Sequence, residues 1–250
     1  MKKLVLAALG TIVLASPTFG AGWGTVKGTV VVKGKAPAPV LLHKKGAALK
    51  KDAEVCAAED LFKDDVVIDE ETGGLANVFI YMARAPKTIH PDLKDAPAEP
   101  VVFGQKNCQF VPHAVVVRVG QSVEVTSDDP IAHNTHTHPL RNNGVNILIP
   151  PNTTAGNGVK VDHKAAERLP TKVTCDLHDF MEARWMIIDH PYATVTNAKG
   201  EFTIENLPDG KHEFIVYHEK ALYIDKKLEV TVKAGEVSEV KPIEVDASKL

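Results

Sequence analysis

Hydrophobic and β-branched residues alternate with polar ones in short runs along most of the chain. Glycine, proline or aspartate residues bound most of these runs, and the runs recur at regular spacing. They are GTVKGTVVVKG (24–34), NVFIYMA (77–83), AVVVRVGQSVEVTS (114–127), RWMIIDH (184–190), EFTIENL (201–207), HEFIVYHE (212–219) and LEVTVKAGEVSEVK (228–241). Such spacing is typical of β-sandwiches and barrels, so the expected fold class is all-β.

Two proline-containing stretches interrupt this pattern and indicate boundary loops. They are ARAPKTIHPDLKDAPAEP (83–100) and the His-Pro pair at 190–191. The block between them contains a histidine, cysteine and methionine cluster, whereas both flanks are Gly-punctuated strands without one. The helical pattern is weak: one short helix is expected within 46–63 and another in DHKAAERLP (162–170).

The first residues, MKKLVLAALGTIVLASPTFGAG, have the order of a secretory signal peptide. Two lysines precede an apolar run from Leu4 to Ala15, and small residues follow that run. We therefore expect residues 1–21 to be cleaved and the mature protein to be secreted or periplasmic. The apolar run is too short to span a membrane, and no other segment is continuously apolar for long enough, so no membrane span is expected.

Charge and cysteine content narrow the range of functions. The formal net charge is −3, and it becomes −5 when Lys2 and Lys3 are removed with the signal peptide. No tract rich in lysine and arginine stands out, which argues against nucleic acid as a partner. Export permits disulfides, and the chain has three cysteines. Two paired cysteines and one left for chemistry are the simplest expectation.

The segment VTCDLHDFMEARWMII (173–188) suggests where that chemistry lies. Cys175, His178 and Met181 follow the spacing C-x-x-H-x-x-M in a loop between two apolar strands. A thiolate and imidazoles in a trigonal plane, with a weak axial thioether, form a copper site. The loop lacks one imidazole, and His133 of IAHNTHTHP (131–139) is a candidate for it.

Each of these residues also has a simpler explanation when it is taken alone. Cys175 would serve as a free thiol or half of a disulfide, and Met181 as a core residue. The pair Cys175 and His178 also suits zinc, although zinc would prefer more thiolates or histidines than the loop contributes. Haem attachment is excluded because Lys172 stands where a further cysteine would be needed.

Two longer segments resemble the halves of a cupredoxin, a type 1 blue copper protein. QFVPHAVVVRVGQSVEVTSDDPIAHN (109–134) resembles the first half, and CDLHDFMEARWMII (175–188) has the short ligand loop of amicyanin. The resemblance covers residues 98–189 and implies a Greek-key β-sandwich that binds one copper ion. It assigns the equatorial ligands to His133, Cys175 and His178, and the axial ligand to Met181.

The resemblance also implies roles for residues around the ligands. The backbone amide of Asn134 is expected to donate a hydrogen bond to the cysteine sulfur. His178 matches the ligand that reaches the surface in the family, and Phe180 would supply apolar docking area around it. Asp179 stands where amicyanin-like loops have proline, so a carboxylate at this face would change which redox partner is tolerated.

The remaining cysteines and histidines have expected roles outside this ligand set. Cys56 and Cys108 are expected to form a disulfide between the flank and the central block, with a metal role as the alternative. His136 and His138 have no counterpart in the ligand set, and they either form a second, weaker metal site or are solvated. We interpret the last group of histidines as structural: His113, His163 and His190.

The flanks resemble another family of modules. GTVKGTVVVKGKAPAPV (24–40) and ATVTNAKGEFTIENLPDGKHEFIVYHEK (193–220) resemble parts of carboxypeptidase-regulatory-like or starch-binding-like β-sandwiches, which are Ig-like, carbohydrate-binding-like folds. This implies a second small sandwich, made of residues 22–90 and 190–250, with the cupredoxin inserted between strands. The alternative is a fusion of two separate small domains.

Together, the resemblances imply an exported mononuclear copper protein that carries single electrons between a donor and an acceptor redox protein, and that is not an enzyme. The flanks show no Ser/His/Asp set, and an oxidase would need several H-x-H pairs where only His136 and His138 form one. Two alternatives stay open. One is a copper-binding or copper-delivery protein without electron transfer, and the other is a carbohydrate- or peptide-binding module with a structural cupredoxin.

Overall fold

The computed structural model describes residues 22–250, so the expected signal peptide at residues 1–21 lies outside the described residues. Within 22–250 the regular structure is almost entirely β, which confirms the all-β prediction. The strands are β1 (Trp23–Lys33), β2 (Leu41–His43), β3 (Leu61–Phe62), β4 (Phe79–Met82), β5 (Val101–Lys106), β6 (Gln109–Val111), β7 (Ala114–Arg118), β8 (Val123–Val125), β9 (His133–His138), β10 (Asn146–Ile149), β11 (Val159–Val161), β12 (Thr171–Thr174), β13 (Glu182–Ile188), β14 (Ala193–Val195), β15 (Glu201–Pro208), β16 (Gly210–His218), β17 (Leu222–Val232), β18 (Val237–Glu239) and β19 (Ile243–Asp246). The helical elements are α1 (Ala53–Cys56) and the 3-10 turns η1 (Pro91–Leu93) and η2 (Ala247–Lys249). None of these helices is long and apolar enough to cross a membrane.

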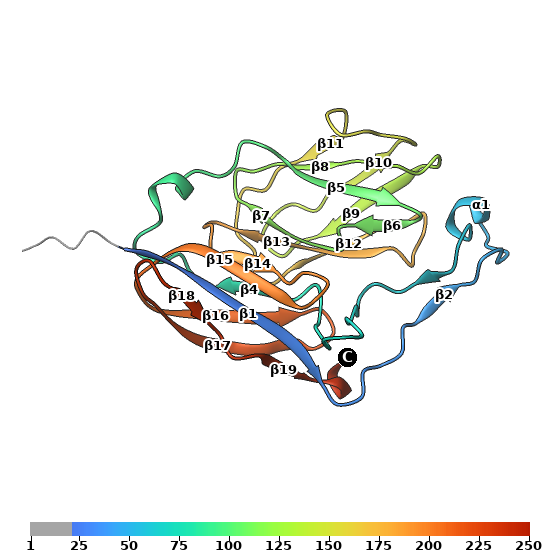
Figure 1. Ribbon diagram of the computed structural model, residues 1–250. Helices are drawn as coiled ribbons and strands as arrows, with labels where there is room; N and C mark the ends of the chain where they lie inside the picture. Colours follow the sequence, from blue (N-terminus) through green and yellow to red (C-terminus); the bar gives the residue numbers. More distant parts are fainter. Residues whose placement is uncertain (1–21) are drawn as a thin grey trace, which may run out of the picture.

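Four sheets and one separate strand pair organise the described residues (Figure 1). Two sheets combine strands from both ends of the chain: β15–β1–β18, with β19 also on β1, and β14–β4–β16–β17. The other two use only strands between residues 101 and 188: β10–β9–β12–β13–β7 and β11–β8–β5–β6. The chain therefore leaves its first pair of sheets after β4, builds the second pair, and returns at β14.

Strands β4 and β13 are buried on both faces, because the two pairs of sheets pack against each other at these strands. This explains why FIYM and WMII are continuous apolar runs rather than alternating ones. Alternate residues of each strand belong to different cores. In β4, Ile80 and Met82 lie in the core of the first pair of sheets, and in β13, Trp185 and Ile187 lie in the core of the second pair. The residues between them, Phe79, Tyr81, Met186 and Ile188, share a separate core. A third apolar core, between β4 and β13, thus lies between the cores of the two sheet pairs.

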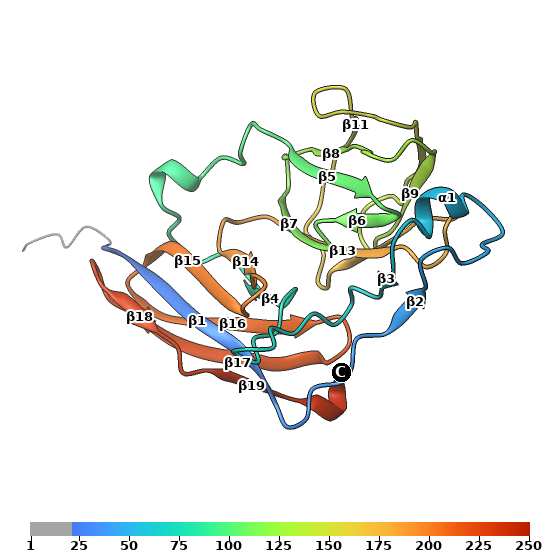
Figure 2. The same ribbon diagram turned by 45° about the vertical axis from the view of Figure 1, so that its right-hand side comes forward.

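Residues 41–63, which we call the cover, leave the first pair of sheets and lie against the second pair (Figure 2). The cover contains β2, α1 and β3, and β2 and β3 pair only with each other. Val55 and Leu49 pack against the core of the second pair of sheets. The prediction assigned all of residues 22–90 to the first sandwich, and the structure differs because the apolar side chains of the cover find their core elsewhere.

The two helix predictions have different outcomes. Helix α1 lies within the expected segment 46–63 and makes a single turn. Residues 162–170 contain no helix, so that prediction is wrong. The segment is held instead by the buried carboxylate of Glu167, which accepts hydrogen bonds from the backbone amides of Leu140, Arg141 and Asn142.

A buried polar cluster joins the residue that follows the cover, Asp64, to both pairs of sheets. The imidazole of His113 lies between the carboxylate of Asp64, 3.2 Å from Nδ1, and the carboxylate of Glu219 at Nε2. Arg184 of β13 forms an ion pair with Glu219, with 2.6 Å between Nη2 and Oε2. Burial alone would lower the pKa of His113, but the two carboxylates outweigh it and raise the pKa to about 9. His113 is therefore a charged structural residue at neutral pH.

We expect this histidine to make stability depend on pH in the alkaline range. Because its pKa rises from 6.5 to about 9 on folding, protonated His113 stabilises the native state fully below pH 6.5, and this contribution is lost as pH rises through 9. In His113→Gln this contribution should be absent, so the loss of stability between these two pH values should be smaller than in the wild type. Urea unfolding of both proteins at a series of pH values measures the difference, which should be on the order of 1–3 kcal/mol. Parallel pH profiles of the two proteins would refute this assignment.

Candidate metal centre

Neighbouring strands of one sheet bring the predicted ligands together. Strand β12 pairs with β9 on one side and with β13 on the other. His133 is the first residue of β9, and Cys175 directly follows β12. His178 and Met181 lie in the loop that returns to β13. The short loop and the antiparallel ladders thus place all four residues at one end of the sheet.

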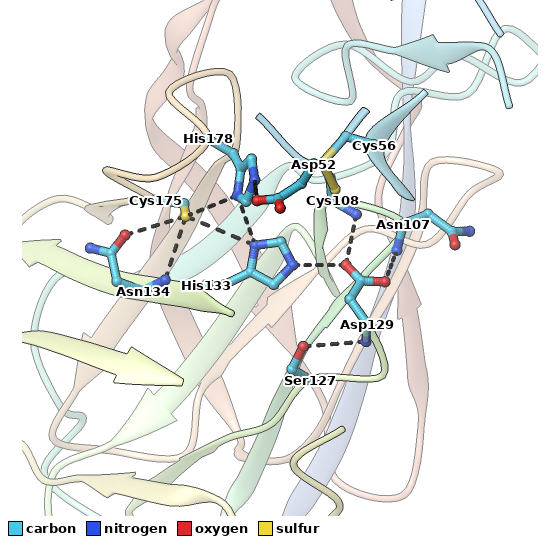
Figure 3. The surroundings of a disulfide bond; sticks show 10 residues. All are labelled: Asp52, Cys56, Asn107, Cys108, Ser127, Asp129, His133, Asn134, Cys175 and His178. Carbon is cyan, nitrogen blue, oxygen red and sulfur yellow. Dashed lines mark hydrogen bonds and ion pairs between the residues drawn. A yellow bond between two sulfur atoms is a disulfide. The ribbon is translucent and has the colours of Figure 1, made fainter. Parts of the chain in front are cut away.

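Three of the predicted ligand atoms form a compact triangle, which we call the ligand triangle (Figure 3). His133 Nδ1 lies 3.1 Å from His178 Nδ1, and Cys175 Sγ lies 4.0 Å and 3.8 Å from these two nitrogens. A point equidistant from three corners with these edges lies about 2.1 Å from each of them, within the range of metal–nitrogen and metal–thiolate bonds, about 2.0 to 2.3 Å. The residues present therefore fit a single metal ion.

Asn134 organises the sulfur and the loop that follows it. Its backbone amide donates to Cys175 Sγ at 3.5 Å, as the sequence predicts. The side-chain oxygen of Asn134 also accepts hydrogen bonds from the backbone amides of Asp176 at 2.6 Å and Leu177 at 3.2 Å. One residue therefore orients the thiolate and fixes the start of the ligand loop.

Met181 closes the loop through its backbone. Its amide donates to the His178 carbonyl at 3.0 Å, and its carbonyl accepts from the Cys175 amide at 3.3 Å. The side chain is buried in the same apolar cluster as Cys175. This places Met181 in the vicinity of the sulfur, and its role as an axial ligand stays a prediction.

A carboxylate holds the outer nitrogen of each ligand histidine. Asp129 Oδ2 lies 2.8 Å from His133 Nε2, and Asp52 Oδ2 lies 3.0 Å from His178 Nε2 (Figure 3). Carboxylates in this position fix the ring orientation and leave the inner nitrogen free for a metal. Sequence reasoning missed both residues. Asp129 lies only four residues before His133, which is a local signal, whereas Asp52 is far from His178 in the chain and has none.

His178 does not reach the surface, so the expectation of an exposed ligand edge is wrong for this chain. Its side chain is 2% exposed, because Asp52 and neighbouring residues of the cover lie over it. Phe180 is half-buried, with its ring edge-to-face with the ring of His43, a residue of the cover, at 4.7 Å. Asp179 is exposed. Docking roles for Phe180 and Asp179 stay predictions, since the ligand they were expected to surround is covered.

Hydrogen bonding in the ligand triangle favours a thiolate. Burial would raise the pKa of Cys175, but hydrogen bonds from His133, His178 and the Asn134 amide outweigh it and lower the pKa to about 6. Burial likewise disfavours a charged His133, yet Asp129 and Cys175 raise its pKa to about 9. A metal ion would displace the remaining proton, because metal ligands must be deprotonated.

The other predicted residues fall into two groups. Cys56 and Cys108 form the predicted disulfide, with their Cα atoms 5.2 Å apart, and Cys175 is the remaining free cysteine. His136 and His138 lie on the exposed side of β9 with ring centroids 4.2 Å apart, beside Asp176 and Thr174. Among residues 22–250, the groups of three or more close potential ligands do not include either histidine. A second metal site there gains no support from the structure.

Comparisons with known proteins give only weak likenesses. No protein-family model matches the chain, and no curated protein sequence matches it. Similar solved structures include amicyanin from Paracoccus versutus (Thiobacillus versutus), at 16% identity over 44% of this chain and 97% of that chain, with a TM-score of 0.30. A purple cupredoxin from Nitrosopumilus maritimus is 14% identical over 36% of this chain and 99% of that chain, with a TM-score of 0.29.

A copper-containing nitrite reductase from Thermus scotoductus SA-01 is also similar, at 13% identity and a TM-score of 0.32. The match covers 44% of this chain but only a quarter (25%) of the reductase. At such low scores, neither membership of a family nor a function follows from these likenesses. The site's own geometry has to carry the functional conclusion.

We expect Cys175 to titrate near pH 6 in the metal-free protein, because the two imidazoles and the Asn134 amide stabilise its thiolate. It is the free thiol of the chain, so ultraviolet thiolate absorbance during a pH titration reports it directly. His133→Ala should raise the midpoint by about one pH unit or more, because a hydrogen bond to the thiolate is lost. A wild-type midpoint near 9.0 would contradict this picture of the site.

Proposed function

We propose that this protein is an exported mononuclear copper protein of the type 1 class that accepts and donates single electrons. The observation that carries the proposal is the ligand triangle of His133, Cys175 and His178. One thiolate and two imidazoles face a common point, and they lie in a buried environment. A thioether, that of Met181, is available on the same loop.

The donor set favours copper over zinc. Structural zinc sites are four-coordinate and use cysteine and histidine ligands, whereas this centre offers three such ligands and a thioether. Thiolate and thioether ligands together with imidazoles in a trigonal plane are typical of copper that exchanges electrons. His133, Cys175 and His178 would hold the ion, Met181 would lie on its axis, and the ion would supply reversible one-electron chemistry.

The residues behind the ligands would keep the centre rigid. Asp129 and Asp52 hold the two imidazoles from their outer nitrogens, and Asn134 holds the sulfur. A site held in one geometry changes little when one electron is added or removed, which favours rapid electron exchange. The proposed partners are a donor and an acceptor redox protein, and we propose no catalytic reaction for the chain itself.

Two features outside the centre belong to the proposal. The Cys56–Cys108 disulfide agrees with an oxidising compartment, which supports cleavage of residues 1–21 and a secreted or periplasmic location. We also propose that residues 22–90, apart from the cover, and residues 190–250 form a carboxypeptidase-regulatory-like sandwich into which the cupredoxin-type unit of residues 98–189 is inserted. The two sheets shared by strands from both ends of the chain support this arrangement.

One observation favours a second candidate, a protein that holds or delivers copper without transferring electrons. The His178 ring lies under the cover, so a partner protein has no direct contact with this ligand. Enclosure of this kind suits retention of the ion. The potential and the rate of electron exchange with small redox proteins would separate the two candidates.

Titration of the metal-free protein with Cu(II) tests the proposal. We expect an intense visible thiolate–copper band that saturates at one copper per chain, together with a narrow parallel hyperfine splitting in the EPR spectrum. Cys175→Ser should lose the visible band and keep the fold, because the band requires the thiolate. A colourless wild-type protein with ordinary tetragonal copper signals would instead mean that the histidines alone bind the metal.

Met181→Leu is the matched variant for the axial position. It should keep the visible band and raise the reduction potential, because the thioether stabilises the oxidised ion. Voltammetry of the wild type and the variant measures the change. A fall in potential would rule out Met181 as the axial ligand while leaving the equatorial assignment intact.

A further inference from the structure

The Cys56–Cys108 disulfide lies immediately beside the ligand histidines. Its two sulfur atoms and a ring nitrogen of His178 all lie within 4.8 Å of one another. The same is true of Cys108 Sγ, a carboxylate oxygen of Asp129 and a ring nitrogen of His133. The bridge therefore joins the cover to the second pair of sheets at the metal centre itself (Figure 3).

Each cysteine is also linked to the carboxylate that holds one of the histidines. The amide of Cys56 donates to the backbone carbonyl of Asp52 at 2.9 Å, and the Asp52 carboxylate contacts His178. The amide of Cys108 donates to the carboxylate of Asp129 at 2.9 Å, and that carboxylate contacts His133. The disulfide thus connects the outer hydrogen bonds of both histidines.

Cys108 occupies a backbone position that does not favour a cysteine. It and Asn107 form the two-residue turn between β5 and β6, and both have positive φ, 56° and 51°. Such turns favour asparagine followed by glycine, because a side chain at positive φ costs conformational energy. Nearby, Asp52 also has a positive φ of 51°. The side chain of Cys108 is therefore placed there at some cost to the backbone.

Apart from the disulfide, the cover is held on the metal centre by few polar contacts. Asp52 contacts His178, and the side-chain amide of Gln109 donates to the Phe62 carbonyl at 3.1 Å. Within the described residues no strand of the second pair of sheets extends the β2–β3 ladder. Helix α1 is one turn long, which is too short to be stable by itself.

We propose that the Cys56–Cys108 disulfide is a redox-controlled latch that keeps the cover closed over the metal centre. With the bridge intact, the cover shields His178 and the ligand loop. When the bridge is reduced, the cover detaches and exposes them to solvent and to a partner. The importance of this access for copper rests on the proposed function, whereas the movement of the cover does not.

The reaction that opens the latch is a thiol–disulfide exchange with a dithiol. Cys56 and Cys108 are 2% and 0% exposed, so the exchange takes place when the cover opens transiently. One thiolate of the dithiol then attacks a sulfur of the bridge, the bond between Cys56 and Cys108 breaks, and a mixed disulfide forms. The second thiol of the reductant resolves it. Two electrons and two protons pass to the protein, so the two cysteines become thiols and the dithiol becomes a disulfide. A dithiol oxidoreductase is therefore the class of partner that would open the cover.

The test measures how fast Cys175 is alkylated in the full chain without copper. Cys175 is 1% exposed, so N-ethylmaleimide should react slowly while the cover is closed. In the double variant Cys56→Ser/Cys108→Ser, Cys175 is the only thiol. We expect its alkylation to be faster by about tenfold or more, because the cover can open locally once no bridge holds it. Val117→Ala, in the core of β7, is the control for general destabilisation and should leave Cys175 protected.

Hydrogen exchange of the wild type, with and without dithiothreitol, gives a second measurement that needs no variant. Reduction should speed exchange in residues 41–63 and 175–181 and leave β7 and β13 protected. Equal protection of the cover in both states, or equal alkylation of Cys175 with and without the bridge, would show that the disulfide only staples the fold. Faster exchange throughout the chain would also overturn the latch, because the bridge would then support the whole structure.

These readouts separate the latch from the proposed function. Both are made without copper, so a protein that opens on reduction but gives no thiolate–copper band would refute the copper centre and keep the latch. A blue protein whose cover stays closed after reduction would refute the latch and keep the copper centre.

Discussion

Burial of strand β13 on both faces is the constraint on which the candidate metal centre depends. Trp185 and Ile187 pack into the core of the second pair of sheets, and Met186 and Ile188 pack against strand β4 of the first pair. A strand enclosed in this way has no freedom to shift its register, because a shift by one residue would exchange the side chains of its two faces. The ligand loop that precedes it is therefore anchored from its C-terminal side.

From this anchor, the ligands are oriented by groups that are themselves held in place. The side chain of Asn134 accepts hydrogen bonds from two backbone amides of the loop. The carboxylate of Asp129 accepts hydrogen bonds from the amides of Asn107 and Cys108, which form the turn of a hairpin. These hydrogen bonds hold the donor atoms in their positions. Such an arrangement suits the proposed copper centre, which would change its charge and keep its geometry.

The cover gives this centre a different relation to solvent from an open electron-transfer site. Asp52 both covers the His178 ring and forms a hydrogen bond with it. Asp52 belongs to the cover, which is more than a hundred residues away from the ligand loop in the sequence. The Cys56–Cys108 disulfide attaches the cover covalently beside the ligand histidines. In the proposed latch, the same few residues would control both access to the centre and the orientation of its ligands.

The sequence alone was sufficient for the features that are encoded locally. Period-two runs and turn residues determined the all-β class, and the spacing of Cys175, His178 and Met181 within one loop predicted the candidate ligand motif. Three cysteines, one of them in that motif, left Cys56 and Cys108 to pair.

Tertiary structure decided what depends on distant packing: the burial of His178, the role of Asp52, and the docking of the cover on the second pair of sheets. It also decided against a helix at 162–170, where the buried carboxylate of Glu167 is satisfied by amides of residues 140–142 rather than by a local turn. The physical reason is the same in each case. Burial and hydrogen bonds between residues far apart in the sequence do not change the local pattern of hydrophobic and polar positions, so that pattern cannot predict them.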